Sequence, residues 1–240
     1  MKHPFRSHIL PYFTIAAGGL GLALRLWLFS ATDEKGLLPA GHPADAALYI
    51  LTALTLGILF LATRTLTPRR IHRKAYRLSN VCAHVLGGLG LILTAILNLS
   101  RGNARLAGIA MVVCIAGGLA MLYMAALRFL RKHPPYWLSV IFTVALMLDT
   151  VAQCQVWGAV PQLQAYFFPL LASVFLILSA YHSTTLAAGK GSPRQLAFFS
   201  QGALFLCCLS LNSEQGLLYL GMLLWTAVQL YPCIRVYKEA

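Results

Sequence analysis

Two ionisable side chains lie inside long apolar stretches of this sequence, where a charge needs a specific reason. Arg25 belongs to the first stretch and Asp149 to the fifth. In a membrane-spanning helix each would cost about 2.5 to 3.5 kcal/mol on insertion scales. At about 1.5 Å per residue, both lie roughly 20 Å from the inner end of their helices. A guanidinium and a carboxylate at one depth can form a charge-assisted contact, so we predict an Arg25–Asp149 ion pair in the outer half of the bilayer.

Further polar residues extend from this position towards the outer surface. Gln153 follows Asp149 by four residues, which places both on one face of a helix. His42 and the acidic residues beside it are expected above them. Together these residues predict a water-filled funnel with a solute site of Arg25, Asp149 and Gln153 at its floor. The alternative is a buried ion pair that only fixes which helices pack together.

The segment 32–45 is the longest loop expected on the outer side, and it carries three of the six acidic residues. Its two Pro and two Gly indicate an ordered, turn-rich loop. A divalent cation could bind there to Asp33, Glu34, His42 and Asp45. The same residues also fit a loop whose acids follow membrane topology and whose prolines fix its shape. This second interpretation predicts no metal site.

His84 and His182 lie near the inner ends of two other apolar stretches. Pairs of imidazoles bind haem or metal ions, so a membrane-embedded haem- or metal-dependent enzyme is one alternative. Polar neighbours beside both histidines instead favour ordinary interfacial side chains and no resident cofactor. The sequence contains no HExxH, GxSxG or Walker A motif, which argues against an enzyme.

The apolar composition sets the expected fold class. The 240 residues are 59% hydrophobic and 10% charged, whereas soluble domains carry about 25% charged residues. Spans of roughly 20 residues leave room for about eight of them. We predict an all-α transmembrane helical bundle in one domain, 1–240, with eight spans in four hairpins. The expected spans are about 10–30, 44–66, 80–99, 105–130, 136–157, 166–188, 195–211 and 216–236.

Basic residues are distributed unevenly between the two sides of this bundle. The formal net charge is +13, and most Lys and Arg fall at the termini or at the loops after every second span. The exceptions are Arg25, Lys35, Arg101 and Arg105. This pattern follows the positive-inside rule and predicts that both termini are cytoplasmic. It explains the positive charge without a nucleic-acid partner.

One basic run follows the second expected span. Its arginines are Arg69, Arg70, Arg73 and Arg77, in a connector that we expect to run to Arg77. The run could bind anionic lipid head groups, at about 1 kcal/mol per basic residue near the surface. Alternatively, it is only a topology signal.

A short motif occurs twice in the first half of the chain. Gly18-Gly19-Leu20-Gly21-Leu22 recurs as Gly87-Gly88-Leu89-Gly90-Leu91. Such repetition would fit parallel copies of one hairpin, as in some transporters. The other explanation, which we favour, is that small residues let two helices approach closely.

The outer loop also shows a resemblance. The run Asp33-Glu34-Lys35-Gly36-Leu37-Leu38-Pro39-Ala40-Gly41-His42-Pro43, after Leu24-Arg25-Leu26-Trp27, resembles a pattern in a family of uncharacterised bacterial multipass membrane proteins. The resemblance implies a bacterial inner (cytoplasmic) membrane location. It supplies no activity and no catalytic residues.

Three functions fit these observations. The first is a permease-like or solute-binding membrane protein with an outward-facing polar cavity. The second is a structural or regulatory subunit that binds a membrane-protein partner. The third is the haem- or metal-dependent enzyme described above. A cavity that reaches Asp149 would favour the first function.

Overall fold

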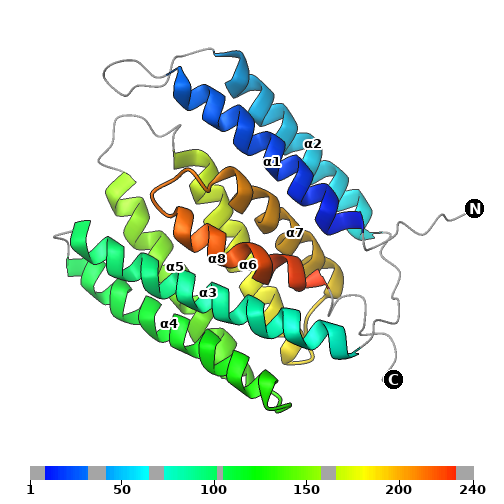
Figure 1. The fold of residues 1–240 in the computed structure, drawn as a ribbon, viewed down its shortest axis with the longest axis vertical. Helices are drawn as coiled ribbons and strands as arrows, with labels where there is room; N and C mark the ends of the chain where they lie inside the picture. Colours follow the sequence, from blue (N-terminus) through cyan, green and yellow to red (C-terminus); the bar gives the residue numbers. More distant parts are fainter. Residues whose placement is uncertain (1–8, 32–41, 65–72, 102–104, 158–165, 231–240) are drawn as a thin grey trace, which may run out of the picture.

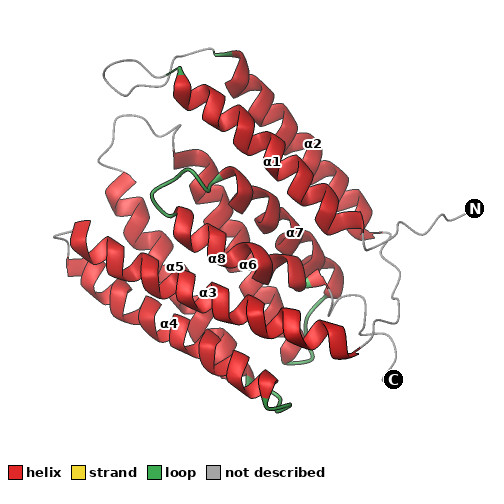
Figure 2. Cartoon of the chain, viewed as in Figure 1, coloured by secondary structure: helices red, strands yellow, loops and turns green. Residues whose placement is uncertain are grey.

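The structure is a computed structural model that describes residues 9–31, 42–64, 73–101, 105–157 and 166–230 (Figure 1). In these residues the chain forms eight α-helices and no strand (Figure 2). The all-α fold class is therefore confirmed. The helices are α1 Ile9–Ser30, α2 Pro43–Arg64, α3 Arg73–Arg101, α4 Arg105–Phe129, α5 Tyr136–Trp157, α6 Phe167–Ala187, α7 Pro193–Leu209 and α8 Gly216–Val228.

Six helices, α1 to α6, contain stretches long and apolar enough to cross a membrane. Apolar side chains such as Ile50, Leu54 and Leu61 of α2 are exposed on their surface, as expected of a helix that faces lipid. The other two helices are shorter, with 17 residues in α7 and 13 in α8. At about 1.5 Å per residue neither reaches the roughly 30 Å of a hydrocarbon core. The chain is thus a multipass membrane protein by length and composition, and a count of eight spans stays a prediction.

Among the helix starts, the largest error of the sequence analysis concerns α3. This helix begins at Arg73, whereas a connector was expected to run to Arg77 and a span to begin near Asn80. Residues 73–79 contain no Pro or Gly, and most are good helix formers, so nothing interrupts the helix between Arg73 and Asn80. The remaining starts lie within two residues of expectation. Residues 231–236 of the last expected span lie outside the described part of the chain.

The last two helices occupy the centre of the bundle. Figure 1 shows α7 and α8 between the α1–α2 pair on one side and the α3–α4 pair on the other. α7 packs against α1 and α6, while α8 packs mainly against α3. Every residue of α7 from Ser200 to Leu209 is buried. The α7–α8 hairpin is therefore largely enclosed by protein, and Leu217 and Leu220 are the large apolar side chains of α8 that stay exposed among the described residues.

The two glycine motifs hold this central hairpin from opposite sides. A Cβ atom on Gly21 of α1 would lie 2.5 Å from Leu209 Cδ1 of α7. A Cβ atom on Gly90 of α3 would lie 3.0 Å from the carbonyl oxygen of Leu217 in α8. A larger residue would therefore require the Leu209 side chain to shift in the first case, and the α8 backbone to give by a few tenths of an ångström in the second. The repeated motif thus marks two close helix contacts, as the packing explanation predicts.

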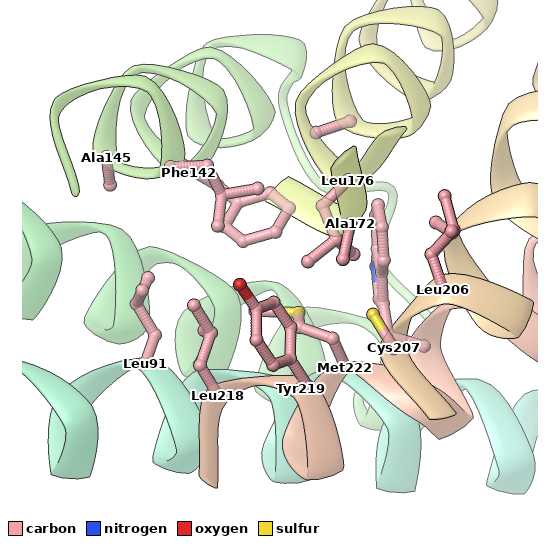
Figure 3. Close-up of a cluster of buried hydrophobic side chains, with 14 of the residues drawn as sticks. Leu91, Phe142, Ala145, Ala172, Leu176, Leu206, Cys207, Leu218, Tyr219 and Met222 are labelled. Carbon is pink, nitrogen blue, oxygen red and sulfur yellow. The ribbon is translucent and has the colours of Figure 1, made fainter. Parts of the chain in front are cut away.

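Aromatic and sulfur-containing side chains fill the space around the hairpin. Figure 3 shows Tyr219 and Met222 of α8 facing Phe142 of α5, with Leu176 of α6 beside them. The ring of Phe142 also meets that of Trp225 edge-on, with 5.2 Å between the centroids. These contacts hold α8 against α5 and α6. They therefore also fix the position of Gln215, which directly precedes α8.

Candidate functional site

Arg25 lies at the end of α7. Its side chain is only 3% exposed, and its Nη1 atom donates a hydrogen bond of 2.8 Å to the carbonyl oxygen of Leu209. Leu209 is the last residue of α7. Carbonyl groups at a helix C-terminus lack intrahelical donors and carry partial negative charge. The end of α7 therefore partly neutralises the guanidinium, and the ring of Phe29 lies 5.4 Å from its central carbon.

Asp149 lies at the start of α8. The carboxylate is 5% exposed, and its Oδ2 atom accepts a hydrogen bond of 2.9 Å from Nε2 of Gln215. Gln215 directly precedes α8 and is itself 1% exposed. The start of a helix carries partial positive charge, which favours a nearby anion. The thiol of Cys114, on α4, also interacts with this carboxyl group.

The turn between α7 and α8 thus connects the two charges. The sequence analysis expected Arg25 and Asp149 to contact each other, but the described side-chain partners of Asp149 are Gln215 and Cys114. The physical reason is that the α7–α8 hairpin occupies the centre of the bundle. The C-terminal end of α7 contacts Arg25, and Gln215, which directly precedes α8, contacts Asp149. The shared depth of the two residues is explained by this common turn.

Tyr219 joins the same network one helical turn after Gln215. Its side chain is fully buried, and its hydroxyl lies 2.9 Å from both the Gln215 Oε1 atom and the Pro169 carbonyl oxygen. The Ser173 hydroxyl lies 3.1 Å away. Tyr219 is also close enough to both Asp149 and Arg25 to interact with them electrostatically. The network therefore links α5, α6 and α8.

The turn lies deeper in the bundle than the ends of the helices around it. Arg25 precedes the end of α1 by five residues, and Asp149 precedes the end of α5 by eight. At about 1.5 Å per residue, these residues lie roughly 8 and 12 Å inside the helix ends. Within the turn, Asn212 and Glu214 are exposed while Ser210 and Gln215 are buried. A few residues therefore separate the exposed surface of the turn from the buried network.

Glu214 also influences the start of α6. Burial raises the pKa of the Tyr166 phenol at the start of α6, and the charge of nearby Glu214 adds to the rise. An acidic and an aromatic side chain therefore lie close together where α6 begins.

Sequence reasoning placed Asp149 and Gln153 on one face, and both are buried on α5, with Gln153 7% exposed. It did not select Gln215, Tyr219 or Ser173, because none lies in the same apolar stretch as Arg25 or Asp149. The available signal was the spacing of Gln215 and Tyr219, two polar residues four apart at the start of an apolar stretch, which places them on one helix face.

The outer-loop residues are only partly described. Asp33 and Glu34 lie outside the described residues. The imidazole Nδ1 of His42 accepts a hydrogen bond of 3.2 Å from the backbone N–H of Ala44, and its ring meets Trp27 edge-on at 5.2 Å. Among the described residues no group of three or more His, Cys, Asp or Glu could hold a metal ion. The expectation of a metal-free loop stays a prediction.

The two inner histidines each have a protein partner. His84 Nδ1 lies 2.8 Å from the carbonyl oxygen of Asn80, and Arg128 Nη1 donates to the side-chain oxygen of the same asparagine. The His182 ring stacks on Phe199 with 5.1 Å between centroids. These contacts position both imidazoles within the protein. The basic run is described only in part, since Arg69 and Arg70 lie outside the described residues, and its lipid contacts stay a prediction.

Comparison of the chain with protein-family models, with curated proteins and with solved structures found no match. The chemistry of the site is therefore inferred from its own side chains. They are a guanidinium, a carboxylate, a primary amide and a phenol, all buried at one turn. Such groups bind polar solutes and exchange protons, so the α7–α8 turn is the best candidate for a functional site in the described part of the chain.

Proposed function

We propose that this protein is a permease-like membrane protein that binds a small polar solute at the α7–α8 turn. The observation that carries the proposal is the position of this turn. It lies inside the ends of the surrounding helices, and it contacts both Arg25 and Asp149. A funnel open on this side would bring a solute to the two charges.

The charge pattern supports an outward direction for the funnel. The sequence concentrates Lys and Arg at the termini and at the connections after α2, α4 and α6. By the positive-inside rule these parts are cytoplasmic, so α1 runs outwards and the end of α7 faces the outside. A bacterial inner membrane is the location that agrees with the resemblance of the first loop.

The mode of charge compensation also favours binding over a purely structural role. A structural ion pair is most stable when its two charges contact each other directly. Here Asp149 contacts an uncharged amide, that of Gln215 at the start of α8. Many transporters bind substrates and ions at such helix ends near the membrane midplane. A solute can replace this neutral contact at the carboxylate.

The direction and openness of the funnel can be tested by thiol labelling in intact cells. The six cysteines are first replaced, and single cysteines are introduced as Asn212→Cys in the turn and Ala188→Cys between α6 and α7. We expect a membrane-impermeant thiol reagent to label position 212 only from outside and position 188 only from inside. Protection of position 212 from the outside reagent would contradict the outward funnel.

Solute binding can be tested with the purified protein. Amino acids, sugars and organic cations would be screened for an increase in melting temperature. We expect the stabilisation by any active compound to disappear in Asp149→Asn and Arg25→Gln, and to remain in Arg64→Gln at the end of α2. Stabilisation that is unchanged in both site variants would exclude the α7–α8 turn as the binding site.

A further inference from the structure

The hydrogen atoms in the Asp149 network can be counted. The Tyr219 hydroxyl has one hydrogen, but two acceptors lie 2.9 Å from it, the carbonyl oxygen of Pro169 and Oε1 of Gln215. Only one of them can receive that hydrogen at a time. The Gln215 side chain contacts Tyr219 with one end of its amide and Asp149 with the other. The position of the hydrogen on Tyr219 therefore depends on the orientation of this amide.

In the first arrangement Asp149 is ionised. Gln215 donates from Nε2 to the carboxylate, Tyr219 donates to Gln215 Oε1, and the Ser173 hydroxyl can donate to the phenol oxygen. The carboxylate receives a donor, as a buried anion requires. In this arrangement the carboxylate, the Gln215 amide oxygen and the Tyr219 hydroxyl each have a hydrogen-bond partner.

In the second arrangement Asp149 carries a proton. The oxygen and nitrogen of an amide occupy nearly the same volume, so a half-turn of the Gln215 amide exchanges them. The carboxyl O–H then donates to Oε1, Nε2 donates to the Tyr219 oxygen, and Tyr219 donates to the Pro169 carbonyl, which already lies 2.9 Å away. The carboxyl group, the Gln215 amide and the Tyr219 hydroxyl again each have a hydrogen-bond partner. The two differ by one proton on Asp149 and by the direction of the hydrogen bonds.

We infer that Asp149 is a proton-binding site whose occupancy is transmitted by Gln215 and Tyr219 to α6. The inference rests on the proposed function and deepens it, because it makes solute binding at the turn proton-linked. The proton comes from water on the side of the turn and binds a carboxylate oxygen. No covalent bond other than that O–H bond forms or breaks.

The surroundings of Asp149 permit both states. α4 contributes the Cys114 thiol, which is neutral when protonated, and α8 contributes the Tyr219 phenol. Cys207 of α7 and Arg25 of α1 interact electrostatically with Tyr219. Directly before α6, the Tyr166 phenol lies next to Glu214 of the turn. Within the described residues no Lys, Arg or His contacts the carboxylate, so no fixed cation holds Asp149 ionised.

Infrared spectroscopy of the purified protein, without solute, can test this inference. The chain contains three aspartates, Asp33, Asp45 and Asp149. In the double variant Asp33→Asn/Asp45→Asn, labelling with carbon-13 aspartate marks Asp149 alone and leaves the network unchanged. We expect the labelled carboxylic C=O band to appear reversibly as the pH is lowered and to disappear as it is raised. A labelled signal that stays constant wherever the protein remains folded would overturn the inference.

The role of Gln215 can be tested in the same labelled background. Gln215→Leu removes the donor to the ionised carboxylate, so the protonated band should persist to a pH higher by about one unit, which is roughly a tenfold change in proton affinity. Gln201→Leu is the matched control, because Gln201 is a fully buried glutamine that contacts Thr14 instead of the network. A midpoint that Gln215→Leu leaves unchanged would contradict transmission through Gln215.

The failure of this inference is distinguishable from the failure of the proposed function. A titrating Asp149 in a protein that no solute stabilises would contradict the solute site alone. Solute binding that depends on Asp149, together with a constant infrared signal, would contradict the proton site alone.

Discussion

The α1–α2 hairpin and the α7–α8 hairpin have similar apolar sequences but opposite surroundings. α2 exposes Ile50, Leu54 and Leu61, whereas α7 is buried from Ser200 to Leu209. The buried hairpin is shorter, with helices of 17 and 13 residues against 22 and 22 in the α1–α2 hairpin. In a membrane, apolarity shows only that a helix avoids water. Helix length here distinguishes the hairpin that packs against protein from the one that exposes apolar side chains.

The largest expected difference between the hairpins is steric. In Gly221→Leu of α8 the new side chain would meet the Leu86 carbonyl oxygen, which lies 2.7 Å from an ideal Cβ. We expect a loss of about 3 kcal/mol or more in the free energy of unfolding. Gly57→Leu of α2 is the control, since no atom lies within 4 Å of an added Cβ there. Denaturant titration in detergent would measure both, and equal stabilities would mean that α8 is not enclosed.

A smaller difference is expected between Arg25, which contacts the central hairpin, and Arg64, which contacts a ring of its own helix. Arg25→Gln removes a buried, charge-assisted hydrogen bond to Leu209, which should cost about 2 kcal/mol. Arg64 lies over the Phe60 ring at 4.3 Å on exposed α2, so Arg64→Gln should cost less than about 1 kcal/mol. Melting temperatures in one detergent would rank the two variants. A larger loss for Arg64→Gln would contradict the assignment of Arg25 to the end of α7.

Hydroxyl groups should show the same contrast at lower magnitude. Ser173→Ala removes a hydroxyl that contacts Tyr219 on the central hairpin, with an expected cost of about 1 kcal/mol. Thr52→Val in α2 removes a hydroxyl that bonds to its own helix at Leu48, and its cost should be close to zero. Thermal unfolding of both variants would measure the difference, and a greater loss for Thr52→Val would reverse the comparison.

The smallest effect concerns coupling across the central turn. Because Arg25 and Asp149 contact different ends of the turn, a double-mutant cycle of Arg25→Gln and Asp149→Asn should give a coupling energy of about 0.5 kcal/mol. A directly paired Arg and Asp would give a larger value, since loss of one partner leaves the other charge unpaired. A coupling above about 2 kcal/mol would restore the ion pair that the sequence predicts.

Helix positions could be predicted from the sequence because Pro, Gly and charged residues interrupt the apolar stretches. α5, for example, begins directly after Pro134-Pro135 and covers the expected residues 136–157. The partner of Asp149 could not be predicted in this way. Gln215 is 66 residues away, and which helix faces α5 depends on packing between helices that are apolar on every side. The sequence positions of Arg25 and Asp149 showed that each buried charge needs a polar partner. Only the packing of the helices shows which groups are those partners.

The late position of the central hairpin in the chain affects biosynthesis. Arg25 is separated by 184 residues from Leu209, which accepts its hydrogen bond. At about 5 to 20 residues per second, the ribosome adds that length in about 10 to 40 s. During this interval the newly inserted α1 carries an arginine whose acceptor has not been synthesised, and the outer helices lack the hairpin around which they pack. The nascent chain therefore completes its bundle only near the end of translation, and before then it is a natural substrate for membrane chaperones and quality-control proteases.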